Sequence, residues 1–231
     1  EWMSLKQIAY KSMIVNISDA IVMNATPLYA LLSVAIPKTY SNKDLKELAK
    51  GFKKAAKKFD IQIIGGDTIS NEKLDISITI ISKTSNPVLR SGVKKNNLIC
   101  YTGTLGSCKE DLGKLFKNEV ISKKSKFIKP KLNPYFFYEI APYITASMDI
   151  SDGLFFELEK LSKSSKIGFE FFNEISENIG SSGEEYEILF SFDEKNLEKI
   201  NKIAQKHKVE LNIFAKAIKG KYRTACKNHH F

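Results

Sequence analysis

Four aspartates in this 231-residue sequence lie inside or directly after apolar segments: Asp19, Asp67, Asp149 and Asp152. The last two stand three positions apart in "ASMDISDGLFFEL" (residues 146–158), and the first lies in a similar stretch, "VNISDAIVM" (15–23). The remaining one directly follows a Gly-Gly pair. Each has a structural alternative, since Asp152 would cap a helix well and Asp67 would shape a turn.

Considered together, the four aspartates favour a metal site. A carboxylate removed from water is destabilised by roughly several kcal/mol unless a cation is paired with it. No arginine or lysine lies within these motifs. Mg²⁺ binds a few carboxylates together with water and substrate phosphates, and aspartates at strand ends and helix starts offer such ligands. We therefore expect a magnesium site made from this set.

Two further features are candidates for binding an anion. Arg90 lies in a loop after Pro87, where its planar guanidinium could bind a phosphate through two hydrogen bonds, although an exposed loop arginine is an equal alternative. The stretch "TGTLGS" (102–107) has glycines that would let backbone amides approach an anion. It is as consistent with a tight turn from a strand into a helix.

Hydrophobic periodicity predicts alternating helices and strands in two units, an α/β or α+β fold. In the first unit we expect helices at 4–23 and from Ser41 or Asn42 to Phe59, and strands at 28–37, 61–64 and 74–82. Turn formers replace this pattern at 83–97, which is the best candidate for a domain junction. In the second unit we expect strands at 98–102, 167–172, 186–192 and 210–218, and helices near 109–117, 134–143, 152–164 and 194–207.

Composition is typical of a soluble globular protein, with 43% hydrophobic and 27% charged residues. No apolar run approaches the roughly 20 residues of a membrane span, and no basic-then-apolar leader opens the chain. We therefore expect a cytoplasmic protein without a membrane partner. The cysteines match no metal spacing and are expected to be reduced thiols: Cys100, Cys108 and Cys226.

The net charge of +10 raises the question of a nucleic-acid partner. Among the 36 basic residues, however, only Arg90 and Arg223 are arginines, and the lysines are spread along helical faces such as "NKDLKELAKGFKKAAKKF". Surfaces that read bases or clamp phosphates rely on the bidentate guanidinium of arginine. We expect a solvated lysine coat and no nucleic-acid partner, which leaves a basic nucleic-acid binder as the less favoured alternative.

Several motifs occur in an order and spacing that resemble one enzyme family: "VNISDAIVMNATPLYALLSVAIP", "IIGGDT", "RSG", "YTGTLG", "MDISDGL" and "SGEEYEILF". By these residues the sequence is similar to the thiamine-monophosphate kinases. The resemblance implies a two-domain fold of the aminoimidazole-ribonucleotide-synthetase superfamily, with an N-terminal ATP- and Mg²⁺-binding domain at 1–86 and a C-terminal domain at 87–231, usually in a homodimer. It implies ATP-dependent phosphorylation of thiamine monophosphate to thiamine diphosphate.

The resemblance also implies roles for particular residues. The magnesium ligands would be Asp19, Asp67, Asp149 and Asp152. The ATP-binding residues would be Gly66, Asp67, Arg90 and Ser151. Glu184 and Phe231 would bind thiamine monophosphate. The turn around Glu184 and Glu185 is otherwise expected to be solvated, and a cationic thiazolium ring would give one of these carboxylates a partner.

The sequence departs from the family's pattern at its beginning. The family carries an upstream Gly-Asp-Asp motif, a Thr-Asp pair and a histidine near the substrate, whereas the sequence here begins at Glu1, so the N-terminal domain is expected to lack its first strands. The segment 173–182 is also short for the family. A non-catalytic nucleotide-binding module and another ATP-using enzyme of the superfamily therefore remain alternatives.

Overall fold

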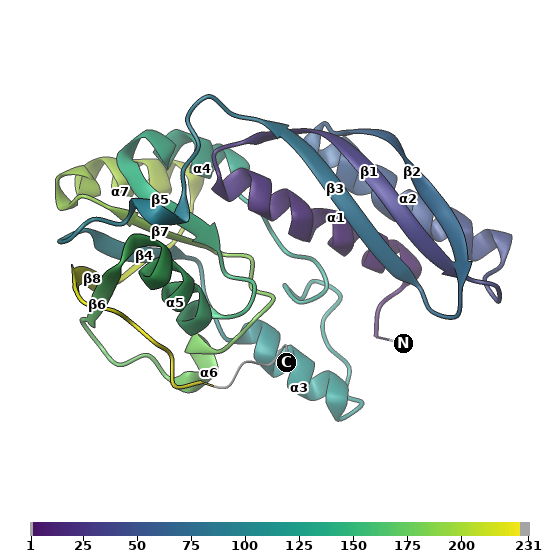
Figure 1. Ribbon diagram of the computed structural model, residues 1–231. Coiled ribbons are helices and arrows are strands. Elements are labelled where there is room, and N and C mark those ends of the chain that lie inside the picture. Colours follow the sequence, from purple (N-terminus) through teal and green to yellow (C-terminus); the bar gives the residue numbers. More distant parts are fainter. Residues whose placement is uncertain (1, 227–231) are drawn as a thin grey trace.

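The computed structural model describes residues 2–226, in which two β-sheets are covered by helices (Figure 1). The first part of the chain, purple to blue in Figure 1, forms α1 (Leu5–Val22), β1 (Thr26–Pro37), α2 (Asn42–Phe59), β2 (Gln62–Asn71) and β3 (Asp75–Lys83). The second part forms β4 (Leu98–Thr102), α3 (Ser107–Phe116), α4 (Pro134–Ile140), β5 (Ile144–Asp149), α5 (Leu154–Ser165), β6 (Ile167–Phe171), α6 (Glu177–Gly180), β7 (Ile188–Phe192), α7 (Leu197–His207) and β8 (Leu211–Lys219). Three short 3-10 helices lie at Arg90–Gly92, Ala141–Tyr143 and Glu194–Asn196.

The two long helices of the first part begin where the sequence supplies a cap. Ser4 and Gln7 exchange side-chain and backbone hydrogen bonds at the start of α1, and Ser41 and Asp44 do the same at the start of α2. Each capping box satisfies amide groups that would otherwise lack partners. Ser41 is therefore the cap of α2, which ends at Asp60 in a left-handed conformation (φ 53°).

The three-stranded sheet has the order β2-β1-β3, with β1 parallel to β2 and antiparallel to β3. Buried and exposed side chains alternate along β1, so its two faces differ. Ala30 and Val34 are buried in the core formed with α1 and α2, whereas Tyr29 and Leu31 point away from the helices and are exposed. This sheet therefore has one covered face and one open face.

The five-stranded sheet has the order β5-β7-β4-β8-β6, and its paired strands are antiparallel. One face packs on α4 and α7 through Phe137 and Ile200, and the other packs on α5 through Leu158. The first core cluster continues into the three-stranded sheet, because α1 contacts both β5 and α4. The end of α1 therefore lies beside the end of β5.

Most of the elements predicted from sequence are confirmed, and two local predictions are wrong. The strand predicted at 61–64 continues to Asn71, so Asp67 lies within a strand and does not shape a turn. Gly153 is the N-cap of α5, and no side chain caps this helix, so Asp152 is not a helix cap. Within residues 2–226, no helix is long and apolar enough to cross a bilayer.

Candidate functional site

Two aspartates meet where the end of α1 lies beside the end of β5. The Asp149 side chain is 4% exposed and is hydrogen-bonded to Ser18. Burial raises the pKa of Asp149 to about 7, and the charges of Asp19 and Glu157 add to this rise. Partial desolvation also raises the pKa of Asp19, against the opposing effect of Arg90 and Lys160. Asp149 and Asp19 form a carboxylate pair whose joint charge is poorly compensated.

The first turn of α5 adds a second carboxylate pair. Glu157 is fully buried and accepts a hydrogen bond from the Asp152 amide (3.0 Å). Lys160 Nζ lies 2.6 Å from Asp152 Oδ2 and 2.9 Å from Glu157 Oε2. The motifs alone contain no cation, but α5 supplies one eight positions after Asp152. Ser151 joins this network through Glu157, 3.3 Å from its Oε1.

A cavity of about 350 Å³ opens beside the first carboxylate pair. Asp19, Arg90, Ser147 and Met148 are among its lining residues. The backbone of Arg90 is held by Ser165, whose hydroxyl donates to the Arg90 carbonyl (2.8 Å), while the exposed side chain stays available to a ligand. This cavity therefore combines a guanidinium with a carboxylate at its wall.

A second cavity, of about 560 Å³, lies beside the start of α5. Its lining residues include two aromatic rings, two carboxylates and a lysine: Phe116, Phe127, Asp152, Glu184 and Lys109. Lys11 Nζ lies 2.6 Å from Glu184 Oε2 and 4.1 Å from the centre of the Phe127 ring. Aromatic faces and carboxylates together suit a ligand that has a cationic ring.

The segment 148–152 borders both cavities. Met148 lines the smaller cavity, and Ser151 and Asp152 line the larger one. Asp149 lies between them along the chain. Segment 148–152 therefore connects the walls of the two cavities along the chain.

Not all of the predicted site residues come together here. Asp67 pairs with Ser33 of β1 in register and lies on the open face of the three-stranded sheet, away from the helices. Gly66 has a φ of +145°, and a Cβ there would lie 1.8 Å from the Leu32 carbonyl oxygen, so the strand pairing alone requires glycine. Phe231 lies outside the described residues, among which no group of three or more His, Cys, Asp or Glu side chains could hold a metal ion.

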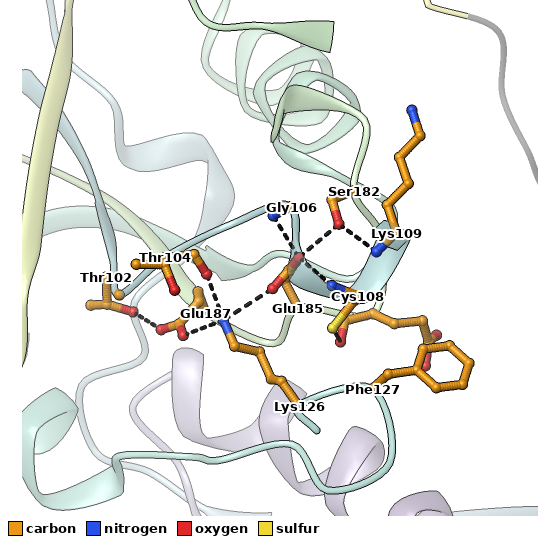
Figure 2. Close-up of polar contacts among 12 residues, drawn as sticks. Thr102, Thr104, Gly106, Cys108, Lys109, Lys126, Phe127, Ser182, Glu185 and Glu187 are labelled. Atoms are coloured by element: carbon orange, nitrogen blue, oxygen red, sulfur yellow. Dashed lines mark hydrogen bonds and ion pairs between the residues drawn. The ribbon is translucent and has the colours of Figure 1, made fainter. Parts of the chain in front are cut away.

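The glycine-containing turn before α3 binds a carboxylate of the protein itself. Glu185 is 1% exposed, and its Oε1 accepts hydrogen bonds from the amides of Gly106 (2.8 Å) and Cys108 (3.2 Å) (Figure 2). The tight-turn interpretation of "TGTLGS" therefore fits the structure. The expected solvation of the 184–185 turn is wrong for Glu185.

Several residues that shape the site were not identified from sequence: Lys11, Lys109, Lys126, Glu157 and Lys160. A signal existed for Glu157, because it lies on the apolar stripe of α5 with Leu154, Leu158 and Leu161. Nothing in the sequence distinguishes the four lysines of this set from the many other lysines of the chain.

Comparisons with known proteins agree with this architecture. A family model described as "AIR synthase related protein, N-terminal domain" matches residues 2–84. Thiamine-monophosphate kinases from Buchnera aphidicola (subsp. Schizaphis graminum) and Pyrococcus horikoshii are 33% and 30% identical over 88% and 87% of this chain, which spans 70% of each relative. A solved structure described as "AaThiL complexed with AMPPCP and TMP" superposes with a TM-score of 0.87 at 21% identity, covering 99% of this chain and 82% of that one.

The fold is thus that of an aminoimidazole-ribonucleotide-synthetase-like protein. The chain belongs to the thiamine-monophosphate kinase family.

Proposed function

We propose that this protein phosphorylates thiamine monophosphate with ATP, forming thiamine diphosphate. The observation that carries the proposal is the placement of segment 148–152 between two cavities, one beside Arg90 and one beside Glu184. The curated relatives that share its sequence are named for this activity. Phosphoryl transfer needs little covalent help from a protein, but it needs both substrates positioned and their charge neutralised.

The carboxylates suit Mg²⁺ as a bound cofactor. Asp149 and Asp19 would hold the ion, since burial raises both pKa values by disfavouring the charged carboxylates, and a divalent cation would offset that cost. Asp152 would be a third ligand if its carboxylate binds the metal while it stays paired with Lys160. When bound, Mg²⁺ would neutralise the phosphates of ATP.

The protein's own residues would then orient the two substrates. Arg90 would bind ATP phosphates through its guanidinium fork at the smaller cavity. Ser151, the other residue expected to contact ATP, lines the larger cavity. Glu184 and Phe127, which contact the Lys11 ammonium group, would exchange it for the thiazolium ring of thiamine monophosphate, held by charge and by cation–π contact in the larger cavity.

The open face of the three-stranded sheet supports a homodimer. Large apolar side chains are exposed on this face: Tyr29, Leu31, Ile69 and Ile81. Exposed apolar area of this kind marks an interaction surface, and a second copy of the chain would cover it. Asp67 and Gly66 would then lie at the dimer interface. We also propose a cytoplasmic location, as expected from the sequence.

A direct assay tests the reaction. The protein is supplied with ATP, Mg²⁺ and thiamine monophosphate, and thiamine diphosphate is followed by chromatography. We expect turnover by the wild type and a loss of at least about 100-fold in Asp149→Asn, because that variant keeps the shape but removes a ligand charge.

The matched control is Asp60→Asn, which removes the same charge from an exposed helix end where asparagine is well tolerated. Full activity of Asp149→Asn would rule out its role as a ligand. A wild type that binds ATP without turnover would favour the non-catalytic nucleotide-binding module.

A further inference from the structure

Lys126 lies at the centre of an ion-pair network beside the larger cavity. It belongs to the segment 117–133, which joins α3 to α4 without regular secondary structure. Its Nζ lies 3.0 Å from Glu185 Oε2 and 2.9 Å from Glu187 Oε1, and it donates to the Thr104 carbonyl at 2.6 Å (Figure 2). The Lys126 side chain is 19% exposed, so these partners replace most of its water.

Lys126 compensates the negative charges of both Glu185 and Glu187. Glu185 is already saturated on Oε1, which accepts from the amides of Gly106 and Cys108 and from Ser182 Oγ (2.7 Å), while its Oε2 faces Lys126. Glu187 accepts from Thr102 Oγ1 (2.6 Å). Burial lowers the pKa of Lys126, but the two carboxylates outweigh burial and raise it above its ordinary value. Two buried carboxylates without this ammonium group would carry uncompensated charge.

The ion pairs of Lys126 hold two parts of the wall of the larger cavity in place, one at Phe127 and one at Glu184. Phe127, the next residue along the chain, lines the cavity and lies under Lys11, which in turn is paired with Glu184. Cys108, held at its amide by Glu185, donates its Sγ–H to the Glu184 carbonyl (3.2 Å). Detaching Lys126 would therefore release Phe127 and loosen Glu184 together.

We infer that Lys126 is a positioning residue: by joining Glu185 and Glu187 it docks segment 117–133 and holds Phe127 and Glu184 where they grip a cationic, aromatic acceptor. This inference rests on the proposed function. It assigns Lys126 to acceptor affinity and not to the transfer step, because Lys126 has no contact with segment 148–152 or Arg90 among its described partners.

The test compares Lys126→Met, Lys126→Arg and Phe127→Leu with the wild type. We expect Lys126→Met to raise the KM for thiamine monophosphate about tenfold while kcat and the KM for ATP change less than about threefold. Lys126→Arg should restore most of the loss, since it keeps the charge. Phe127→Leu should reproduce the KM effect with the ion pairs intact. Lys123→Met, an exposed lysine of the same segment, is the control.

Binding supplies an independent readout. The single tryptophan, Trp2, packs edge-on against Phe116 of the cavity wall (5.3 Å between ring centroids), so its fluorescence should report thiamine monophosphate. We expect Lys126→Met to weaken this titration by the same factor as the KM.

The outcomes separate this inference from the proposed function. Unchanged binding and KM in a folded Lys126→Met, or equal losses for both substrates, would overturn the inference alone. If Lys126→Met does not fold, an unaltered acceptor KM in Phe127→Leu would overturn it. A wild type that neither phosphorylates nor binds thiamine monophosphate would overturn the proposed function and this inference with it.

Discussion

At the scale of single residues, Asp149 is held where its charge is disfavoured. The side chain is buried beside two other carboxylates, those of Asp19 and Glu157, and its hydrogen bond from Ser18 offsets only part of the cost. A fold that keeps such an arrangement gains from a divalent cation, because one ion would neutralise charge that the surrounding side chains compensate poorly. The magnesium ligands remain a prediction that the pH dependence of stability can test.

In metal-free buffer we expect the raised pKa of Asp149 to make the wild type less stable, relative to Asp149→Asn, as pH rises from about 4 to about 7. Folding raises the pKa of Asp149 from 3.8 to about 7, so in this window the folded state holds a proton that the unfolded state has released. The stabilisation is complete below about pH 4 and is lost as pH passes about 7. Asp149→Asn should weaken this slope and melt roughly 3–5 °C higher than the wild type above pH 7.

Thermal unfolding in a chelator across this pH range measures the effect. Asp60→Asn, which loses an exposed charge, should follow the wild-type profile. Added Mg²⁺ should stabilise the wild type above pH 7 more than it stabilises Asp149→Asn. Parallel profiles for the wild type and Asp149→Asn would contradict the raised pKa.

At the scale of elements, local signals predicted the helices and the central strands well. Ser4 and Ser41 mark the starts of α1 and α2. In β3 the half-buried Ile76, Ile78 and Ile80 alternate with exposed polar residues. The strand β2 was predicted too short because every one of its residues is exposed. This strand is stabilised by its pairing with β1, so its own sequence does not need, and does not show, an alternating hydrophobic pattern.

Gly66 shows how β2 is held, and its replacement tests that account. Its φ is +145°, and a Cβ at this position would lie 1.8 Å from the Leu32 carbonyl oxygen, so Gly66→Ala cannot keep both the backbone conformation and the strand spacing. We expect the substitution to cost about 3 kcal/mol of unfolding free energy, from backbone strain and steric overlap. Urea unfolding measures the change.

The neighbouring glycine is the matched control. At Gly65 a Cβ would meet only the Leu31 side chain, at 3.4 Å, so Gly65→Ala should stay within about 1 kcal/mol of the wild type. Equal stabilities for the two variants would mean that Gly66 is not required by the strand pairing. ATP binding, the role that the resemblance implies for Gly66, would then be the remaining explanation for a glycine at this position.

The site itself could be predicted only where it is local in sequence. Asp149 and Asp152 were identified because one short motif carries both. Lys126 lies 59 and 61 positions from Glu185 and Glu187, and no periodicity connects them. The division of the chain at 86–87 also stays a prediction, because the first hydrophobic core continues from α1 across it.

At the scale of the whole molecule, the open face of the three-stranded sheet is the main feature that one chain does not explain. β2 lies at the edge of the sheet, and β1 and β3 present Leu31 and Ile81 to solvent on this face. Register places Asp67 on the same face, beside Ser33. An apolar face with an unpaired edge invites association, and a symmetric dimer would satisfy both.

We expect the protein to be a dimer in solution and the double variant Ile69→Lys with Ile81→Lys to be a monomer. These side chains are 58% and 42% exposed, so charging them should leave the chain folded while placing like charges in a symmetric interface. Light scattering after gel filtration at several concentrations gives the mass. Val120→Lys, at a 95% exposed position outside this sheet, should remain a dimer. A monomeric wild type, or a double variant that still dimerises, would show that the open face is not the interface.

If Asp67 serves the active site from that interface, the monomeric variant should also lose turnover, although neither substitution touches Asp149, Arg90 or Glu184.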